Sequence, residues 1–375
     1  TIVISEGRIL AVGTAPEIPA DARRIDMTGL IAYPGFIDAH SHLGIAETER
    51  TAEERIRLEG TSPDPIEQAE TLTREAGRRG IRAHLRGTDL YAVDAKARES
   101  MRREGFTAAL IAPRDGILSG TSDLIELGDE PLRRSIIAER VAQHVSFTVG
   151  ELGEYPRTIL GVFAVFRQTL LDARWHAKLL KWHERHPNDG ETIATDAGLD
   201  ALQPTLARSQ PVIFTANTEN EIRRALDLGK EFGLNIIISG GKEAWKLANR
   251  IKAERVPLIV SLKFDEEPEF GKKKSAAKEV EKPTQPAESE KKDPKKDAEL
   301  YEPLKVRQEK RRLWEEQAAN VVRLHEAEIP FALTTRDFKN AADFTKNLRM
   351  VIEKGLPVDA AVAALAQTPA EFFGM

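Results

Sequence analysis

The stretch PGFIDAHSHLG, residues 34–44, decides the fold and the candidate site. After Pro-Gly, residues 36–42 read as a strand. Side chains two positions apart on a strand share a face, so Asp38, His40 and His42 are expected to project together. A lone histidine is more often a hydrogen-bonded core residue, but a His-x-His pair at a strand end is typical of half a metal site.

The chain around this stretch alternates short apolar runs with segments of helical period. The runs lie at residues 107–112, 212–216, 234–239, 256–263 and 329–334. Buried parallel strands read as continuous apolar runs because helices cover both faces of their sheet. Residues 219–232 and 243–254 repeat apolar positions every three or four residues, which predicts helices. The alternation predicts an α/β fold, as a parallel sheet or a closed barrel.

Two segments lie outside this alternation. Residues 1–12 alternate around Glu6-Gly7, which predicts a β-hairpin. Residues 265–304 are rich in charge and poor in apolar side chains, so we expect a disordered insertion there. Helical periodicity resumes over residues 305–328.

Composition narrows the classes of function. The 375 residues include no cysteine, which excludes a disulfide scaffold, a thiolate metal site and a cysteine nucleophile. The net charge of −5 predicts no nucleic-acid partner, and no apolar run approaches a membrane span. We expect a small-molecule substrate, and a homo-oligomer stays open. Because Thr1 reads as a trimmed start, both cytoplasm and export stay open.

The chain resembles the amidohydrolase superfamily, and within it the imidazolonepropionase-related group. The opening segments 3–13 and 29–44 and the repeated βα pattern up to TPAEFFGM, residues 368–375, carry this resemblance. It implies a (β/α)8 TIM-type barrel over residues 34–375, preceded by a partial small β-sandwich over residues 1–33. It also implies hydrolysis of carbon–nitrogen bonds in cyclic amides or amide-like substrates by water activated on a divalent metal, with zinc expected.

The resemblance also asks for metal ligands beyond the histidine pair. Histidine is usual on strands five and six, but Thr215 and Ser239 stand at those places. On strand eight, Asp337 is the predicted ligand and catalytic base, unless the register places Arg336 there. A guanidinium at that position would repel a metal ion. The predicted mononuclear metal set is His40, His42 and Asp337.

Strand four offers no firm ligand. Glu126 and Lys178 are nearest by spacing, but both read more simply as surface or helix residues. His144 could reach the barrel mouth, although a local backbone contact is the simpler interpretation. The three histidines within residues 175–186 share a period with two tryptophans, which favours a solvated amphipathic helix over a second metal site.

Two polar segments supply the predicted substrate-binding residues. Residues 113–116 and 119–122 are expected to form a Gly-rich loop in which Arg114 holds an anionic group, although a solvent loop explains them as well. Asn217 follows strand five, where a helix N-cap is the simpler interpretation.

Two functions follow from these observations. The first is a metal-dependent hydrolase of carbon–nitrogen bonds. The second is a catalytically degenerate barrel, a pseudoenzyme kept as a binding or scaffold protein, because Thr215 and Ser239 replace expected ligands.

Overall fold

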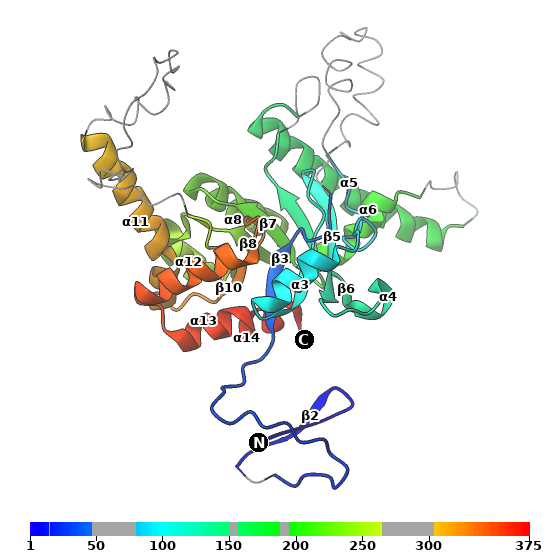
Figure 1. Cartoon of the computed structure of the whole chain (residues 1–375). Coiled ribbons are helices and arrows are strands. Elements are labelled where there is room, and N and C mark those ends of the chain that lie inside the picture. The colour runs from blue at the N-terminus through cyan, green and yellow to red at the C-terminus, as the bar shows by residue number, and fades with distance from the viewer. Residues whose placement is uncertain (15, 47–79, 150–155, 188–194, 265–303) are drawn as a thin grey trace, which may run out of the picture. The chain divides into compact units, whose positions relative to one another are not determined.

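The computed structural model describes residues 1–14, 16–46, 80–149, 156–187, 195–264 and 304–375 (Figure 1). They divide into two units, Thr1–Pro34 and Gly35–Met375. The insertion predicted over residues 265–304 lies outside the described residues except for Leu304, where helix α11 begins. Within the described ranges, no helix is long and apolar enough to cross a lipid bilayer.

The N-terminal unit contains a β-hairpin. Strands β1 (Ile2–Ser5) and β2 (Arg8–Val12) pair antiparallel. Glu6 and Gly7 both take positive φ, 49° and 74°, as a tight two-residue hairpin turn requires. The predicted hairpin is confirmed. The other described residues of this unit form no strand, so among them the expected partial β-sandwich is reduced to one two-stranded sheet.

The second unit is built on an eight-stranded sheet whose strands follow one another in chain order. The strands are β3 (Phe36–Ser41), β4 (Phe106–Ile111), β5 (Leu118–Glu126), β6 (Ile136–Ser146), β7 (Val212–Ala216), β8 (Ile236–Gly240), β9 (Leu258–Ser261) and β10 (Phe331–Thr334). The sheet curves into a nearly closed barrel, which confirms the predicted TIM-type architecture. Neighbouring strands are parallel, except that β5 runs antiparallel to both β4 and β6.

The reversal of β5 follows from the length of its connection. Only residues 112–117 link β4 to β5, whereas a parallel return needs a crossover of about a dozen residues or more. The chain therefore turns straight back. This corrects one expectation, because residues 119–122 lie buried within strand β5 and not in a polar loop.

A seam of side-chain hydrogen bonds joins the first and last strands of the barrel. Thr335, directly after β10, donates to the buried Asp38 carboxylate of β3 from its backbone nitrogen at 3.1 Å and its hydroxyl at 2.5 Å. The Thr334 hydroxyl donates to the carbonyl oxygen of His40. Asp38 therefore faces the seam, which corrects the expectation that it projects beside the two histidines.

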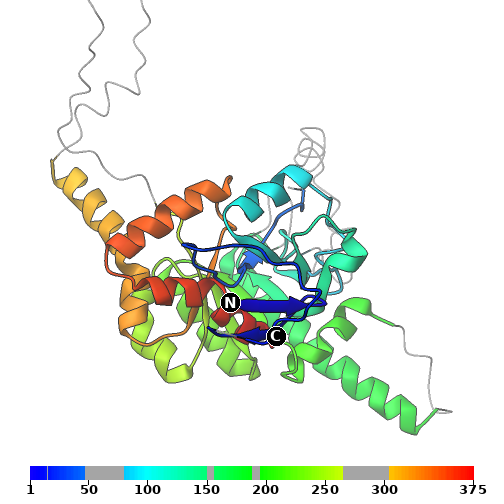
Figure 2. The same cartoon turned by 60° about the horizontal axis from the view of Figure 1, so that its bottom comes forward.

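Helices surround this sheet (Figures 1 and 2). They are α3 (Ala95–Arg103), α4 (Leu132–Ser135), α5 (Ile159–Arg185), α6 (Ala197–Ala201), α7 (Gln203–Leu206), α8 (Glu219–Phe232), the 3-10 helix η2 (Ala244–Leu247), α9 (Ala248–Glu254), α11 (Leu304–Glu326), α12 (Ala341–Glu353), α13 (Val358–Leu365) and α14 (Gln367–Phe373).

Helix α8 shows how the sequence sets these boundaries. The Thr218 side chain accepts from the Glu221 nitrogen, and the Glu221 side chain accepts from the Thr218 nitrogen, so the first turn carries a reciprocal capping box. Gly233 ends the helix in the left-handed region at φ 66°. The predicted helix over residues 219–232 is confirmed, whereas the one over residues 243–254 divides into η2 and α9.

The barrel interior is layered along its strands. Ile213, Ile237, Ile259 and Ala332 belong to an apolar cluster against which the Phe372 and Phe373 side chains of α14 pack. Two positions further along the same strands, four hydroxyl residues follow: Thr215, Ser239, Ser261 and Thr334. Because side chains two apart share a face, the interior changes from an apolar plug to a hydroxyl layer toward the carboxyl ends of these strands. That change locates the polar site.

Candidate functional site

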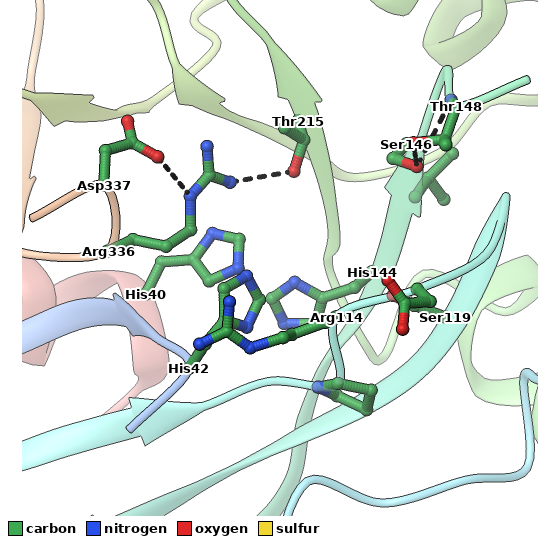
Figure 3. A pocket seen from close by; sticks show the side chains of 13 residues that line it. His40, His42, Arg114, Ser119, His144, Ser146, Thr148, Thr215, Arg336 and Asp337 are labelled. Atoms are coloured by element: carbon green, nitrogen blue, oxygen red, sulfur yellow. Dashed lines mark hydrogen bonds and ion pairs between the residues drawn. The ribbon is translucent and has the colours of Figure 1, made fainter. Parts of the chain in front are cut away.

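A polar pocket of about 490 Å³ opens above the hydroxyl layer (Figure 3). The residues that line it are His40, His42, Pro113, Arg114, Asp115, Ser119, His144, Val145, Ser146, Thr148, Thr215, Arg336 and Asp337. They come from β3, β5, β6 and β7 and from the segments after β3, β4, β6 and β10. The carboxyl ends of barrel strands are where this architecture places active sites.

The structure brings the predicted histidine pair into this pocket. The rings of His40 and His42 meet edge to face with their centroids 5.1 Å apart. His42 Nδ1 lies 2.8 Å from the carbonyl oxygen of Ala112, which can only accept, so Nδ1 carries the proton and Nε2 carries the lone pair. His40 Nδ1 bonds the Ser239 hydroxyl at 2.7 Å, while its buried Nε2 has no hydrogen-bond partner among the described residues.

A third imidazole, His144 of β6, completes the cluster. Its ring centroid lies 4.7 Å from that of His40. Both ring nitrogens are buried and lack hydrogen-bond partners within the described chain, so the local backbone contact expected for His144 is wrong. The alternation of Ala142, His144 and Ser146 along one strand was the signal that could have placed it here.

All three imidazoles are held neutral. Burial, then the charge of Arg336, lowers the pKa of His40 well below its ordinary range. Burial also lowers the pKa of His42 to about 4, with Arg336 and Arg114 adding to the effect. For His144, burial together with His42 and Arg336 lowers the pKa to about 3. At neutral pH the cluster therefore offers uncharged nitrogens, which are weak bases.

Arg336 occupies the strand-eight position that faces the histidines. Its side chain is only 8% exposed. Its Nε donates to Asp337 Oδ1 at 3.2 Å and its Nη1 donates to the Thr215 hydroxyl at 3.1 Å. Figure 3 shows the guanidinium between these two partners and beside the His40 ring. The structure thus has the alternative register considered from the sequence, in which Arg336 and not Asp337 faces the histidines.

Asp337 lines the pocket but is engaged by cations. Burial opposes its ionisation, yet the charge of Arg336, hydrogen bonds from Ser261 and Arg336, and the charge of Lys242 lower the pKa of this carboxyl. A carboxylate with a lowered pKa and an arginine partner is a weak proton acceptor. Its predicted role as catalytic base stays a prediction with little support from this geometry.

The predicted metal set does not assemble. Among the described residues, no three histidine or acidic side chains are arranged to hold a metal ion. His40 and His42 are neighbours, but Asp337 pairs with Arg336, and that guanidinium would repel a divalent cation. The donors present therefore do not fit the zinc site that the resemblance implies.

The other predicted residues divide between the pocket and the surface. Arg114 lines the pocket, and its Nε donates to the Ile45 carbonyl oxygen at 3.1 Å. Asn217 is absent from the lining, because its backbone nitrogen donates to the Glu221 carboxylate at 2.8 Å in the α8 cap and its side chain lies against Gly240. Glu126 and Lys178 are exposed and also outside the lining.

The histidines of helix α5 form no metal site with other described residues. His176 is buried and lies 3.1 Å from the Asp200 carboxylate, and His186 stacks on Trp182 with ring centroids 4.9 Å apart. Trp175 and Trp182 are exposed, at 65% and 45%. The helix is therefore amphipathic as predicted, with two tryptophans on its solvated side.

Known proteins resemble the chain in sequence and in fold. An imidazolonepropionase from Thermoanaerobacter pseudethanolicus is 42% identical over 59 residues, 16% of this chain and 14% of that protein. An adenine deaminase from Shewanella halifaxensis is 36% identical over 85 residues, 23% of this chain and 14% of that protein. The crystal structure of an amidohydrolase from Thermotoga maritima superposes with a TM-score of 0.71 and 18% identity, covering 100% of this chain and 84% of that one.

The resemblance to the amidohydrolase superfamily is confirmed. The sequence matches span only about one-seventh of each of these two relatives, and no protein-family model matches the chain. The structural match shows the fold alone, a barrel like that of the Thermotoga protein. The activity of this chain is therefore a matter for proposal.

Proposed function

We propose that this amidohydrolase-type barrel binds a small polar molecule in its pocket and does not hydrolyse it with metal-activated water. The observation that carries the proposal is the buried Arg336 guanidinium, held by Asp337 and Thr215 beside three neutral imidazoles. A divalent ion would have to share the pocket with that fixed positive charge.

The protonation states of the site support binding over catalysis. A general base works best when its pKa lies near the operating pH. His42 and His144, with pKa values of about 4 and 3, accept protons poorly at neutral pH. The pocket is instead rich in hydrogen-bonding groups, including the hydroxyls of Ser119, Ser146 and Thr148.

Metal uptake by the purified full chain tests this proposal. The protein is stripped with a chelator, dialysed against micromolar Zn²⁺ or Co²⁺ at pH 7.5, and analysed for bound metal and for hydrolysis of cyclic amides. We expect well under one equivalent of metal, no visible Co²⁺ bands of a histidine-ligated ion, and no hydrolysis. Near-unit occupancy together with hydrolysis would overturn the proposal.

Metal-dependent hydrolysis of carbon–nitrogen bonds is the second candidate. The names of the relatives favour it, and so do the buried nitrogens of His40 and His144 that have no hydrogen-bond partner in the described part of the chain. It predicts stoichiometric metal that is lost in His40→Ala while the barrel stays folded. His325→Ala, which removes an exposed histidine of α11, is the matched control.

A further inference from the structure

The Arg336 guanidinium leaves one hydrogen-bonding end unused in the described structure. Nε and Nη1 are engaged by Asp337 and Thr215, whereas Nη2 makes no hydrogen bond to the described residues. The side chain is more than nine-tenths buried and lines the pocket. Nη2 is not among the enclosed partnerless atoms of the described residues, so it is open to the pocket. A cationic donor in that position favours an acceptor that carries negative charge.

The charges around the pocket favour such an acceptor. Arg336 and Arg114 line it, together with Asp337 and the exposed Asp115. Both Arg336 and Lys242 act on the Asp337 carboxylate, so more than one cation offsets its negative charge. Burial is the main cause of the lowered pKa of His42, but among the charges that act on this ring Arg336 and Arg114 both contribute more than Asp337.

We propose that the ligand of this pocket carries an oxyanion group, a carboxylate or a phosphate, that binds the Nη2 end of Arg336. This inference rests on the proposed binding function and names its ligand class. Arg114 supplies a second positive charge at the pocket edge, where its bond to the Ile45 carbonyl fixes the guanidinium. Arg336 thus gives the pocket its fixed cation, and Asp337 and Thr215 orient that cation.

Isothermal titration calorimetry on the full chain at low ionic strength tests the inference. The probes are benzoate, its neutral isostere benzamide, and inorganic phosphate. We expect benzoate or phosphate to bind clearly more tightly than benzamide. Arg336→Gln should weaken oxyanion binding about ten- to a hundredfold, the range for loss of one charge-assisted hydrogen bond, and should leave benzamide unchanged.

Two further variants keep the test decisive. Arg114→Gln should weaken the same probes even if Arg336→Gln fails to fold. Arg312→Gln, on the exposed face of α11 where the arginine pairs with Glu309 and Glu316, is the matched control and should bind like the parent.

The outcomes separate this inference from the proposed function. Equal binding of benzoate and benzamide, with no effect of either pocket variant, would overturn the oxyanion inference but leave pocket binding in place. Absence of binding by all three probes would also overturn the inference. Stoichiometric metal with hydrolysis would instead overturn the proposed function.

Discussion

Acid should destabilise the barrel through its buried histidines. A histidine whose pKa is lowered on folding binds fewer protons in the folded state, so its stabilisation is complete above the unfolded pKa of 6.5 and is lost as the pH falls below it. For His144, with a folded pKa of about 3, the free energy of unfolding is about 2 kcal/mol lower at pH 5 than at pH 8. His42, with a folded pKa of about 4, contributes a similar decrease, so the two histidines together lower the free energy of unfolding by about 4 kcal/mol.

Guanidinium chloride unfolding at pH 8 and pH 5, with a chelator present, measures this loss. His144→Gln should reduce the pH difference in unfolding free energy by about 2 kcal/mol, because the glutamine side chain does not titrate. His325→Gln on the exposed side of α11 is the control and should retain the difference of the parent. Burial raises the pKa of Asp38, which acts in the opposite direction, but equally in parent and variant. An unchanged pH difference in His144→Gln would refute the reasoning.

Five substitutions at four positions test the framework around the site by unfolding midpoints. Asp38→Ala should cost about 3–5 kcal/mol, because it leaves the donors of Thr335 buried and unpaired at the seam, and Asp38→Asn should cost less; equal costs would count against the seam. Gly240→Ala should cost about 1–3 kcal/mol, since a Cβ would lie 2.4 Å from Asn217 Oδ1 at φ 103°, and Gly233→Ala, with open space around it, should cost about 1 kcal/mol. Thr218→Ala should cost about 1 kcal/mol through the lost α8 cap, and no change would exclude that role.

The same polar layer explains both the site and its departure from the predicted metal centre. Thr215 and Ser239 stand where the resemblance asks for histidines, and each hydroxyl bonds a neighbouring site residue, Arg336 or His40. Hydroxyls are poor ligands for a transition-metal ion but good partners for a guanidinium and an imidazole. The two replacements therefore belong to one consistent arrangement with Arg336.

The sequence alone determined the barrel architecture and the part of the site formed by His40 and His42. Buried strands appear in the sequence as short apolar runs, and amphipathic helices as apolar residues repeated every three or four positions. The bounds of β7 to β10 and α8 were therefore predictable within a residue or two. The His-x-His pair likewise lies at the end of one strand, with His40 in β3 and His42 directly after it, so local spacing could place the two rings together.

Only the tertiary structure decided which side chains face the two histidines. Whether Arg336 or Asp337 faces the histidines depends on where the chain leaves β10, and the seam with Asp38 fixes that point across almost the whole length of the chain. His144 was missed because the strand that carries it reaches the site only through pairing with β5 and β7. The reversal of β5 has a local cause instead, the short connection from β4 over residues 112–117.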